Sequence, residues 1–266
     1  MSGTLKAKIT ALVLALICLG VIVPVQNRID VIRKAMAEEY EMPRQLPLAA
    51  ATSAAMGGFR GIAVDILWIQ ADSMINKKQF YQLAAYYELI SVLQPNFPAV
   101  FQFNAWNLAF NISAEWGRPE EKWDWLKKGI EFAEKGFEFN PDSAALALDI
   151  AFLYSHKVDS EQYFIDKLRE EKGLNHYEEA AKWALRAANL ARQKGESGLN
   201  ERRFAYNALF RYGKYIATLG NLAEAKRILD QSEEGARTLL SEYPEDQVVY
   251  NLVVDIRAEK SRLGLD

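Results

Sequence analysis

From residue 61 to the C-terminus, apolar residues recur at helical spacing, and no stretch alternates apolar with polar residues as a strand would. Proline-containing segments separate these periodic stretches and combine a helix end with the start of another helix: QPNFP (94–98), NPDS (140–143) and YPED (243–246). We therefore predict an all-α fold. The expected helices are 61–76, 79–93, 98–115, 119–137, 142–156, 160–170, 176–194, 200–219, 222–242 and 245–263.

Small residues recur where pairs of these helices would cross. In YGKYIATLGNLAEAKRIL, the residues Gly213, Ile216, Gly220 and Ala225 fall at the spacings of the tetratricopeptide (TPR) motif. LWIQADSMINKKQFYQLAAYYELISVLQP carries a similar pattern with larger residues. Over about 61–250 the chain resembles the TPR family, which implies a degenerate α-solenoid of helical hairpins, with extra residues inserted around SAEWGRPEEKWDW. Stacked hairpins would complete a core that no single hairpin could bury.

Three further segments carry a second resemblance. GGFRGIAVDILWIQAD, AWNLAFNISAEW and EEKWDWLKKGI are similar to signatures of a family of bacterial membrane-anchored proteins, over roughly 55–190. That resemblance implies a helical domain on the outer side of a membrane, held by an N-terminal anchor. It implies no activity.

Residues 9–25, ITALVLALICLGVIVPV, form an apolar run without a charged side chain. At 1.5 Å per residue the run is about 26 Å long, close to the roughly 30 Å hydrocarbon core of a bilayer. Because the following VIVPVQN is bulky and offers no cleavage site of small residues, we predict an uncleaved transmembrane anchor at 9–26 that contacts the lipid bilayer. A cleaved signal peptide and a buried soluble helix are the alternatives.

The charges on the two sides of this run nearly balance, so the orientation rests on the short N-terminal tail. We expect residues 1–8 in the cytoplasm and the bulk of the chain on the periplasmic side of the inner membrane. A juxtamembrane helix and linker at 27–60 then lead into a TPR-like domain at 61–266. Within the linker, 44–61 is either an entry loop with a first capping helix or a segment that lies on the membrane or on a partner chain.

Composition argues against several classes of function. The net charge is −3, and no block of Lys and Arg is longer than a pair, so we expect no nucleic-acid binding. With Cys18 as the single cysteine, the chain forms no internal disulfide and no cysteine-based zinc site. His156 and His176 stand in no metal-binding or catalytic motif, and no glycine-rich phosphate loop is present. We predict no enzyme activity, no catalytic residues, no cofactor and no metal.

Aromatic and amide side chains concentrate between residues 98 and 129. Asn104 and Asn111 flank Asn107 on one stripe of the expected helix, where they either grip a ligand or fit between helices. In both plausible TPR registers Trp106 and Phe110 line the groove of that family, and Asn107 does so in one. The candidate partner-binding groove consists of Trp106, Phe110, Asn107 and Phe103. Rings would bury a partner's side chains, and amides would bind its extended backbone.

A second candidate surface consists of Trp116, Trp123, Trp125 and Arg60. Trp123 and Trp125 are two residues apart and cannot share a helix face, so we expect one to pack inward and the other to be partly exposed or to meet a partner. Arg60 would pair with Asp65 or Asp72, or with lipid phosphate.

These features predict a membrane-anchored scaffold for protein–protein interaction, an accessory or assembly subunit of a bacterial membrane or envelope complex. Its partners would be other membrane or envelope proteins. The alternative is a structural subunit that associates with itself through the solenoid ends and the 44–60 segment.

Overall fold

The computed structural model describes residues 60–265 of the chain, and all regular structure in this part is helical, without a strand. The predicted all-α class is therefore confirmed for the described residues. The predicted anchor at 9–26 and the linker up to residue 59 lie outside them. Among the helices that are described, none combines the length and the apolar character that a membrane crossing requires.

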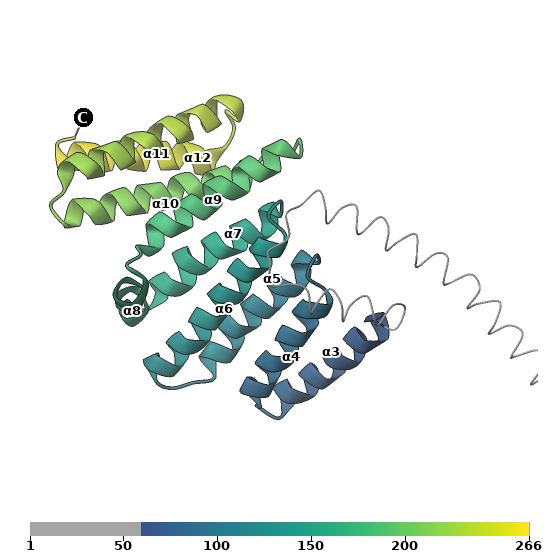
Figure 1. Cartoon of the computed structure of the whole chain (residues 1–266). Coiled ribbons are helices and arrows are strands. Elements are labelled where there is room, and N and C mark those ends of the chain that lie inside the picture. Colours follow the sequence, from purple (N-terminus) through teal and green to yellow (C-terminus); the bar gives the residue numbers. More distant parts are fainter. Residues whose placement is uncertain (1–59, 266) are drawn as a thin grey trace, which may run out of the picture. The chain divides into compact units, whose positions relative to one another are not determined.

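The chain divides into two compact units, Met1–Gln94 and Pro95–Asp266. In the first, α3 (Arg60–Asn76) and α4 (Phe80–Leu93) form a hairpin (Figure 1). Their contact buries apolar side chains of both helices, and the ring of Trp68 lies 6.0 Å from that of Tyr87. The described part of the first unit is thus a helical pair with its own apolar contact.

The second unit is a series of helices in which each packs on its neighbours (Figure 1). Three helix pairs follow one another: the helix that begins with α5 packs on α6, the helix that begins with α7 packs on α9, and α10 packs on α11. α10 also packs on α9, and α12 closes the series on α11. The elements are α5 (Pro98–Trp106), η2 (Asn107–Ile112), α6 (Pro119–Phe139), α7 (Ala144–Phe152), η3 (Leu153–Lys157), η4 (Val158–Ser160), α8 (Gln162–Lys172), α9 (His176–Gln193), α10 (Leu199–Thr218), α11 (Leu222–Glu242) and α12 (Gln247–Leu263).

The helix starts follow from local side-chain chemistry. Pro98 and Pro119 begin α5 and α6, where a missing N–H costs no hydrogen bond. The Asn175 side chain accepts hydrogen bonds from backbone N–H groups in the first turn of α9, and Asp246 does the same for α12. These signals are local, which is why the predicted bounds agree with the observed ones to within a few residues.

Two of the expected helices differ from regular α-helix. The spans predicted as 98–115 and 142–156 each change from α-helix to π-helix, η2 and η3, in their C-terminal part. A π turn places an extra residue in the helix and shifts the direction of the side chains that follow. In η2 the turn is accompanied by a ladder of amides, because Asn111 Nδ2 donates to Asn107 Oδ1 at 2.6 Å and Asn107 Nδ2 donates to the Phe103 carbonyl at 3.0 Å.

Paired helices approach most closely at glycines. A Cβ on Gly129 of α6 would lie 2.8 Å from the Ala109 Cβ and 2.8 Å from the Ala105 carbonyl oxygen. A Cβ on Gly213 of α10 would lie 2.8 Å from the Leu229 side chain of α11. At both glycines the backbone of one helix therefore contacts the neighbouring helix directly, with no room for a methyl group.

We predict that Gly129→Ala destabilises the protein by about 1–3 kcal/mol, because the new methyl group meets backbone that cannot move aside. In an unobstructed helix interior the same change would stabilise by up to about 1 kcal/mol, so a net loss measures the clash. Urea unfolding followed by circular dichroism tests this. Gly117→Ala is the control, since a Cβ there has nothing within 4 Å, and it should change stability by less than about 0.5 kcal/mol. Equal stability of the two variants would contradict the close approach.

Candidate partner-binding face

Aromatic rings from three helices of the second unit form one continuous contact, here called the aromatic row: Trp106, Phe110, Phe152, His156 and Phe204. Trp106 stacks on Phe110 with ring centroids 4.1 Å apart, and Phe152 stacks on His156 at the same separation. The two stacks meet where Trp106 and Phe152 lie 5.7 Å apart. Phe204 completes the row, 6.4 Å from Phe152 and 5.7 Å from His156.

The row occupies the first helix of each of three successive pairs. Trp106 ends α5 and Phe110 lies in η2, Phe152 ends α7 and His156 lies in η3, and Phe204 belongs to α10. In the first two helices the rings are four residues apart and straddle the change from α-helix to π-helix. π turns occur frequently at functional sites, and here two of them coincide with one surface.

The row is partly open to solvent. The Trp106 side chain is 46% exposed although it contacts two other rings, and Phe103, one turn earlier, is 52% exposed. The Lys157 ammonium lies 5.3 Å from the centre of the Phe110 ring. Trp106 is more exposed than Trp123 and Trp125, which are almost completely buried, and exposed aromatic clusters of this kind mark interaction sites.

A polar network lies beside the row and connects three elements. Asp159 of η4 accepts hydrogen bonds from His176 Nε2 at 3.1 Å, Tyr177 Oη at 2.5 Å and the Arg211 guanidinium at 2.5 Å. The guanidinium also lies 4.5 Å from the centre of the Tyr177 ring. Burial alone would raise the pKa of Asp159, but the hydrogen bond from Tyr177 and the charge of Arg211 outweigh it and leave the pKa below its usual value. Asp159 therefore joins η4, α9 and α10 as a stable carboxylate.

Neither histidine is arranged for acid–base chemistry. Burial lowers the pKa of His176, and burial with the nearby charge of Arg211 lowers that of His156, so both are neutral at pH 7. Ser155 Oγ lies 2.8 Å from His156 Nδ1, and Ser155 is only 4% exposed. Among the described residues, no cluster of histidine, cysteine and carboxylate side chains could hold a metal ion.

The residues predicted for the groove come together in part. Trp106 and Phe110 lie in the aromatic row, and Phe103 is exposed on the turn before it. Asn107 is half-buried and uses its amide within its own helix. Asn104 is completely buried, and its side-chain amide has no hydrogen-bond partner among the residues that the structure describes. The asparagine stripe is therefore divided between packing and helix structure.

The second predicted surface is different from expectation. Trp123 is 2% exposed and Trp125 is 1% exposed, so the prediction that one of them would be partly exposed is wrong. The reason is that α6 is covered on two sides. Trp125 stacks on the half-buried Trp116, while Trp123 packs on Phe164 of α8 and donates to Glu171 Oε1 at 3.0 Å. Arg60 lies in the first unit, in the first turn of α3.

Sequence reasoning missed Phe152, His156 and Phe204 as members of the face. Phe152 and His156 are four residues apart in the helix predicted at 142–156, which was a usable signal, because that helix has the same place in its pair as the helix of Trp106. For Phe204 the sequence carried no comparable signal, since its neighbours Arg202 and Arg203 suggest a solvated face.

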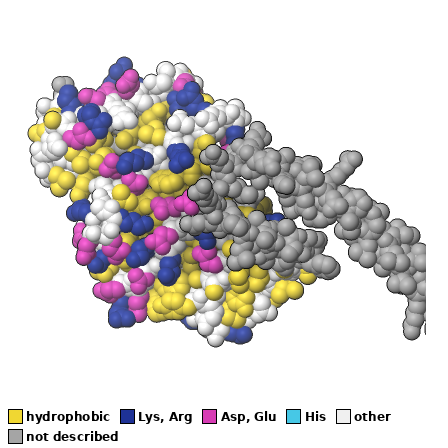
Figure 2. Space-filling model, viewed as in Figure 1, with side chains coloured by type: hydrophobic (Ala, Val, Ile, Leu, Met, Phe, Trp, Pro, Cys, Tyr) yellow, Lys and Arg dark blue, Asp and Glu magenta, His cyan; other side chains and the backbone are white. Residues whose placement is uncertain are grey.

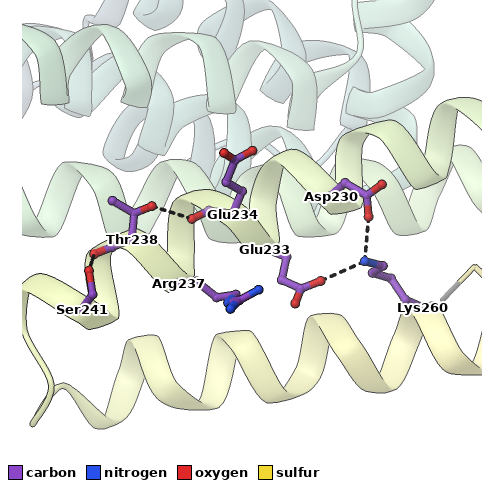
Figure 3. A pocket seen from close by; sticks show the side chains of 7 residues that line it. All are labelled: Asp230, Glu233, Glu234, Arg237, Thr238, Ser241 and Lys260. Carbon is purple, nitrogen blue, oxygen red and sulfur yellow. Dashed lines mark hydrogen bonds and ion pairs between the residues drawn. The ribbon is translucent and has the colours of Figure 1, made fainter.

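Elsewhere on the molecule the surface is mixed. Figure 2 shows acidic and basic side chains interspersed between patches of hydrophobic ones on the visible face. A depression of about 620 Å³ lies between α11 and α12 (Figure 3). Its charges largely satisfy one another, because Lys260 binds Asp230 at 2.6 Å and Glu233 at 2.8 Å. The depression is therefore a weaker candidate for a binding site than the aromatic row.

Comparison of the chain with protein-family models, with curated proteins and with solved structures finds no match.

We predict that Trp106→Ala costs about 1–2 kcal/mol of stability, because it removes ring contacts worth about 0.5–1.5 kcal/mol from a half-exposed site. Trp125→Ala should cost about 3–5 kcal/mol, as for a large ring removed from a core. Urea unfolding of both variants measures the difference. An equal cost at the two positions would mean that Trp106 is a core residue and that the row is not an open face.

Asp159→Asn should lower stability at pH 7 by about 1–3 kcal/mol, because the charged Arg211 guanidinium loses its ion-pair partner. The pKa of Asp159 is lower in the folded state, so its contribution is present above the unfolded pKa, about 3.9, and is lost as the pH falls through the folded value. The stability gap between wild type and variant should therefore narrow below about pH 4. Urea unfolding at a series of pH values measures it, with exposed Asp255→Asn as the control. If the difference in the free energy of unfolding between wild type and Asp159→Asn does not change with pH, the stabilising role of the Asp159 carboxylate is contradicted.

Proposed function

We propose that this chain is a membrane-anchored, TPR-like helical-repeat scaffold that binds a segment of another membrane or envelope protein on its aromatic row. The observation that carries the proposal is Trp106, whose ring is 46% exposed while stacking on Phe110 and facing Phe152. A tryptophan held in this way loses little conformational freedom when a partner covers it.

The arrangement of helices supports a binding role over a catalytic one. The row spans three successive helix pairs, and such a surface accommodates an extended or helical segment along several contact points. Phe103 enlarges the apolar part by one helical turn. The asparagine amides of η2 are engaged within the helix, so the rings are the contact we assign to the partner.

The location of the partner follows from the sequence. An anchor at 9–26 would hold the helical part close to the membrane, on the periplasmic side of the inner membrane in our proposal. Proteins of the same membrane or envelope would then meet the row at a high effective concentration. An accessory or assembly subunit fits this combination of anchor, helical scaffold and partly open aromatic surface.

A second candidate function is self-association. It is favoured by α12, on which Tyr250 is 53% exposed and Val254, one turn later on the same face, is 47% exposed. Exposed apolar side chains on one helix face would suit contact with a second copy.

Site-specific photo-cross-linking in native membranes tests the proposal. A photoreactive residue at Phe103 of the full-length chain should give a specific product with another protein, and Trp106→Ala should reduce it at least about tenfold, the effect of a hot-spot residue. A photoreactive residue at Arg237, exposed on α11, is the control and should give no such product. The partner is identified by mass spectrometry, and the contact is repeated with purified proteins.

A product of unchanged yield in Trp106→Ala would contradict binding on the aromatic row. If position 254 cross-links to a second copy of the chain while position 103 gives nothing, self-association is the function instead.

A further inference from the structure

The aromatic row ends beside a carboxylate. Asp149 lies on α7, three residues before Phe152, and Gln102 lies on α5, four residues before Trp106. The Gln102 side-chain amide donates to Asp149 Oδ2 at 2.5 Å, which bridges the two helices one turn away from the contact between Trp106 and Phe152. A carboxylate therefore lies one helical turn from the exposed Trp106 ring.

Asp149 lacks a cation of its own. Some other acidic side chains that bridge helices of the second unit are paired with arginine, as Asp159 is with Arg211 and Glu242 with Arg202, whereas Glu134 accepts a hydrogen bond from Tyr154. For Asp149 the described residues provide the hydrogen bond from Gln102 and no ion pair, and Oδ1 accepts no hydrogen bond from them. Burial raises the pKa of this carboxyl, which shows that its charge is poorly compensated. A partly buried carboxylate of this kind gains stability when a cation reaches it.

The neighbouring Trp106 ring also favours the binding of a cation. Tryptophan is the aromatic side chain that attracts cations best, and Trp106 presents about half of its surface to solvent. An arginine or lysine that reaches Asp149 would lie across or beside this ring. The guanidinium of arginine suits both contacts, because it is planar, stacks on aromatic faces and donates to both oxygens of a carboxylate.

The charge along the row is directional. Asp149 lies at the end near Gln102, and the cations Lys157 and Arg211 lie at the end near Phe110 and His156. At the second end Asp159 balances the charge of Arg211. A basic side chain is therefore attracted to the first end rather than to the second, while apolar side chains fit the rings between them. This pattern selects a peptide segment over a small cation, because only a segment supplies a basic residue with apolar neighbours.

Building on the proposed function, we infer that the partner segment carries a basic residue, arginine above all, that binds between the Trp106 ring and the Asp149 carboxylate, with apolar neighbours on Phe110, Phe152 and Phe204. The Gln102 amide positions Asp149 Oδ2 and leaves Oδ1 for the partner.

Two synthetic peptides of the same shape test the inference: acetyl-Ala-Leu-Arg-Leu-Ala-amide and the same peptide with citrulline in place of arginine. Citrulline keeps the length and planarity of arginine but has no charge. Binding to the full-length protein in detergent micelles is measured by calorimetry and by NMR. The arginine peptide should bind about tenfold more tightly, as expected for an ion pair combined with a cation–π contact.

Asp149→Asn should reduce this preference to what the cation–π contact with Trp106 alone supplies, while leaving the weak binding of the citrulline peptide unchanged. The variant has the same shape and can still accept the hydrogen bond from Gln102, so we expect it to fold. Asp255→Asn, an exposed acid on α12, is the control and should keep the preference. In wild type, saturation with the arginine peptide should also lower the pKa of the Asp149 carboxyl, followed by its ¹³C resonance.

The inference is wrong if the two peptides bind wild type equally, if neither binds at millimolar concentration, or if Asp149→Asn retains the full preference. The proposed function fails separately, when the cross-link from position 103 does not depend on Trp106. Reduction of the arginine preference in Asp149→Asn together with loss of all peptide binding in Trp106→Ala would support both.

Discussion

The close approach of paired helices at small residues is the constraint on which the rest of the second unit depends. Gly129 meets the backbone of the helix that carries Ala105 and Ala109, and Gly213 meets Leu229. At such crossings an added atom produces a clash, at Gly129 with backbone and an alanine methyl that have no rotamer freedom, and at Gly213 with the buried Leu229 side chain. The first helix of each pair is therefore held in a defined position relative to its partner. Rings on successive first helices can then meet at stacking distances across different helices.

The alanine-rich helix α9 extends this effect from one pair to the next. It packs on α7 on one side and on α10 on the other. Ala184 contributes to a buried cluster with Ala151 of α7 and Ala205 of α10, and the ring of Phe204 packs against that cluster. Short side chains at the centre bring the backbones close together, so that larger ones at the edge reach one another. The contact of Phe204 with Phe152 and His156 is a consequence of that spacing. Substituting larger residues on α9 would separate the row before it unfolded the helices.

How much of this was predictable depends on the range of the interaction concerned. Helix bounds came from prolines, caps and apolar spacing, which act within a few residues, and they agree with the structure. Trp106 and Phe110 were found because they share one helix. Phe204 was not, because its neighbours in space lie on another helix pair. The π turns had no signature, since a change in hydrogen bonding from i+4 to i+5 leaves the composition unchanged. The burial of both Trp123 and Trp125 was missed because α8 covers α6 from a distant part of the sequence.

Asp149 and Asp159 show why residue type alone could not define the site. Asp149 lies on α7, and Asp159 lies just after that helix, in η4. Both side chains are partly buried. Despite its burial, the hydrogen bond from Tyr177 and the charge of Arg211 lower the pKa of Asp159. Burial raises the pKa of Asp149, because the hydrogen bond from the neutral Gln102 amide does not compensate for it. Asp159 has a structural role, because its charge is balanced within the fold. The Asp149 carboxylate keeps an uncompensated charge beside the exposed Trp106 ring. The free-energy cost of burying this charge in the isolated chain is offset only when a cation from a partner binds next to it.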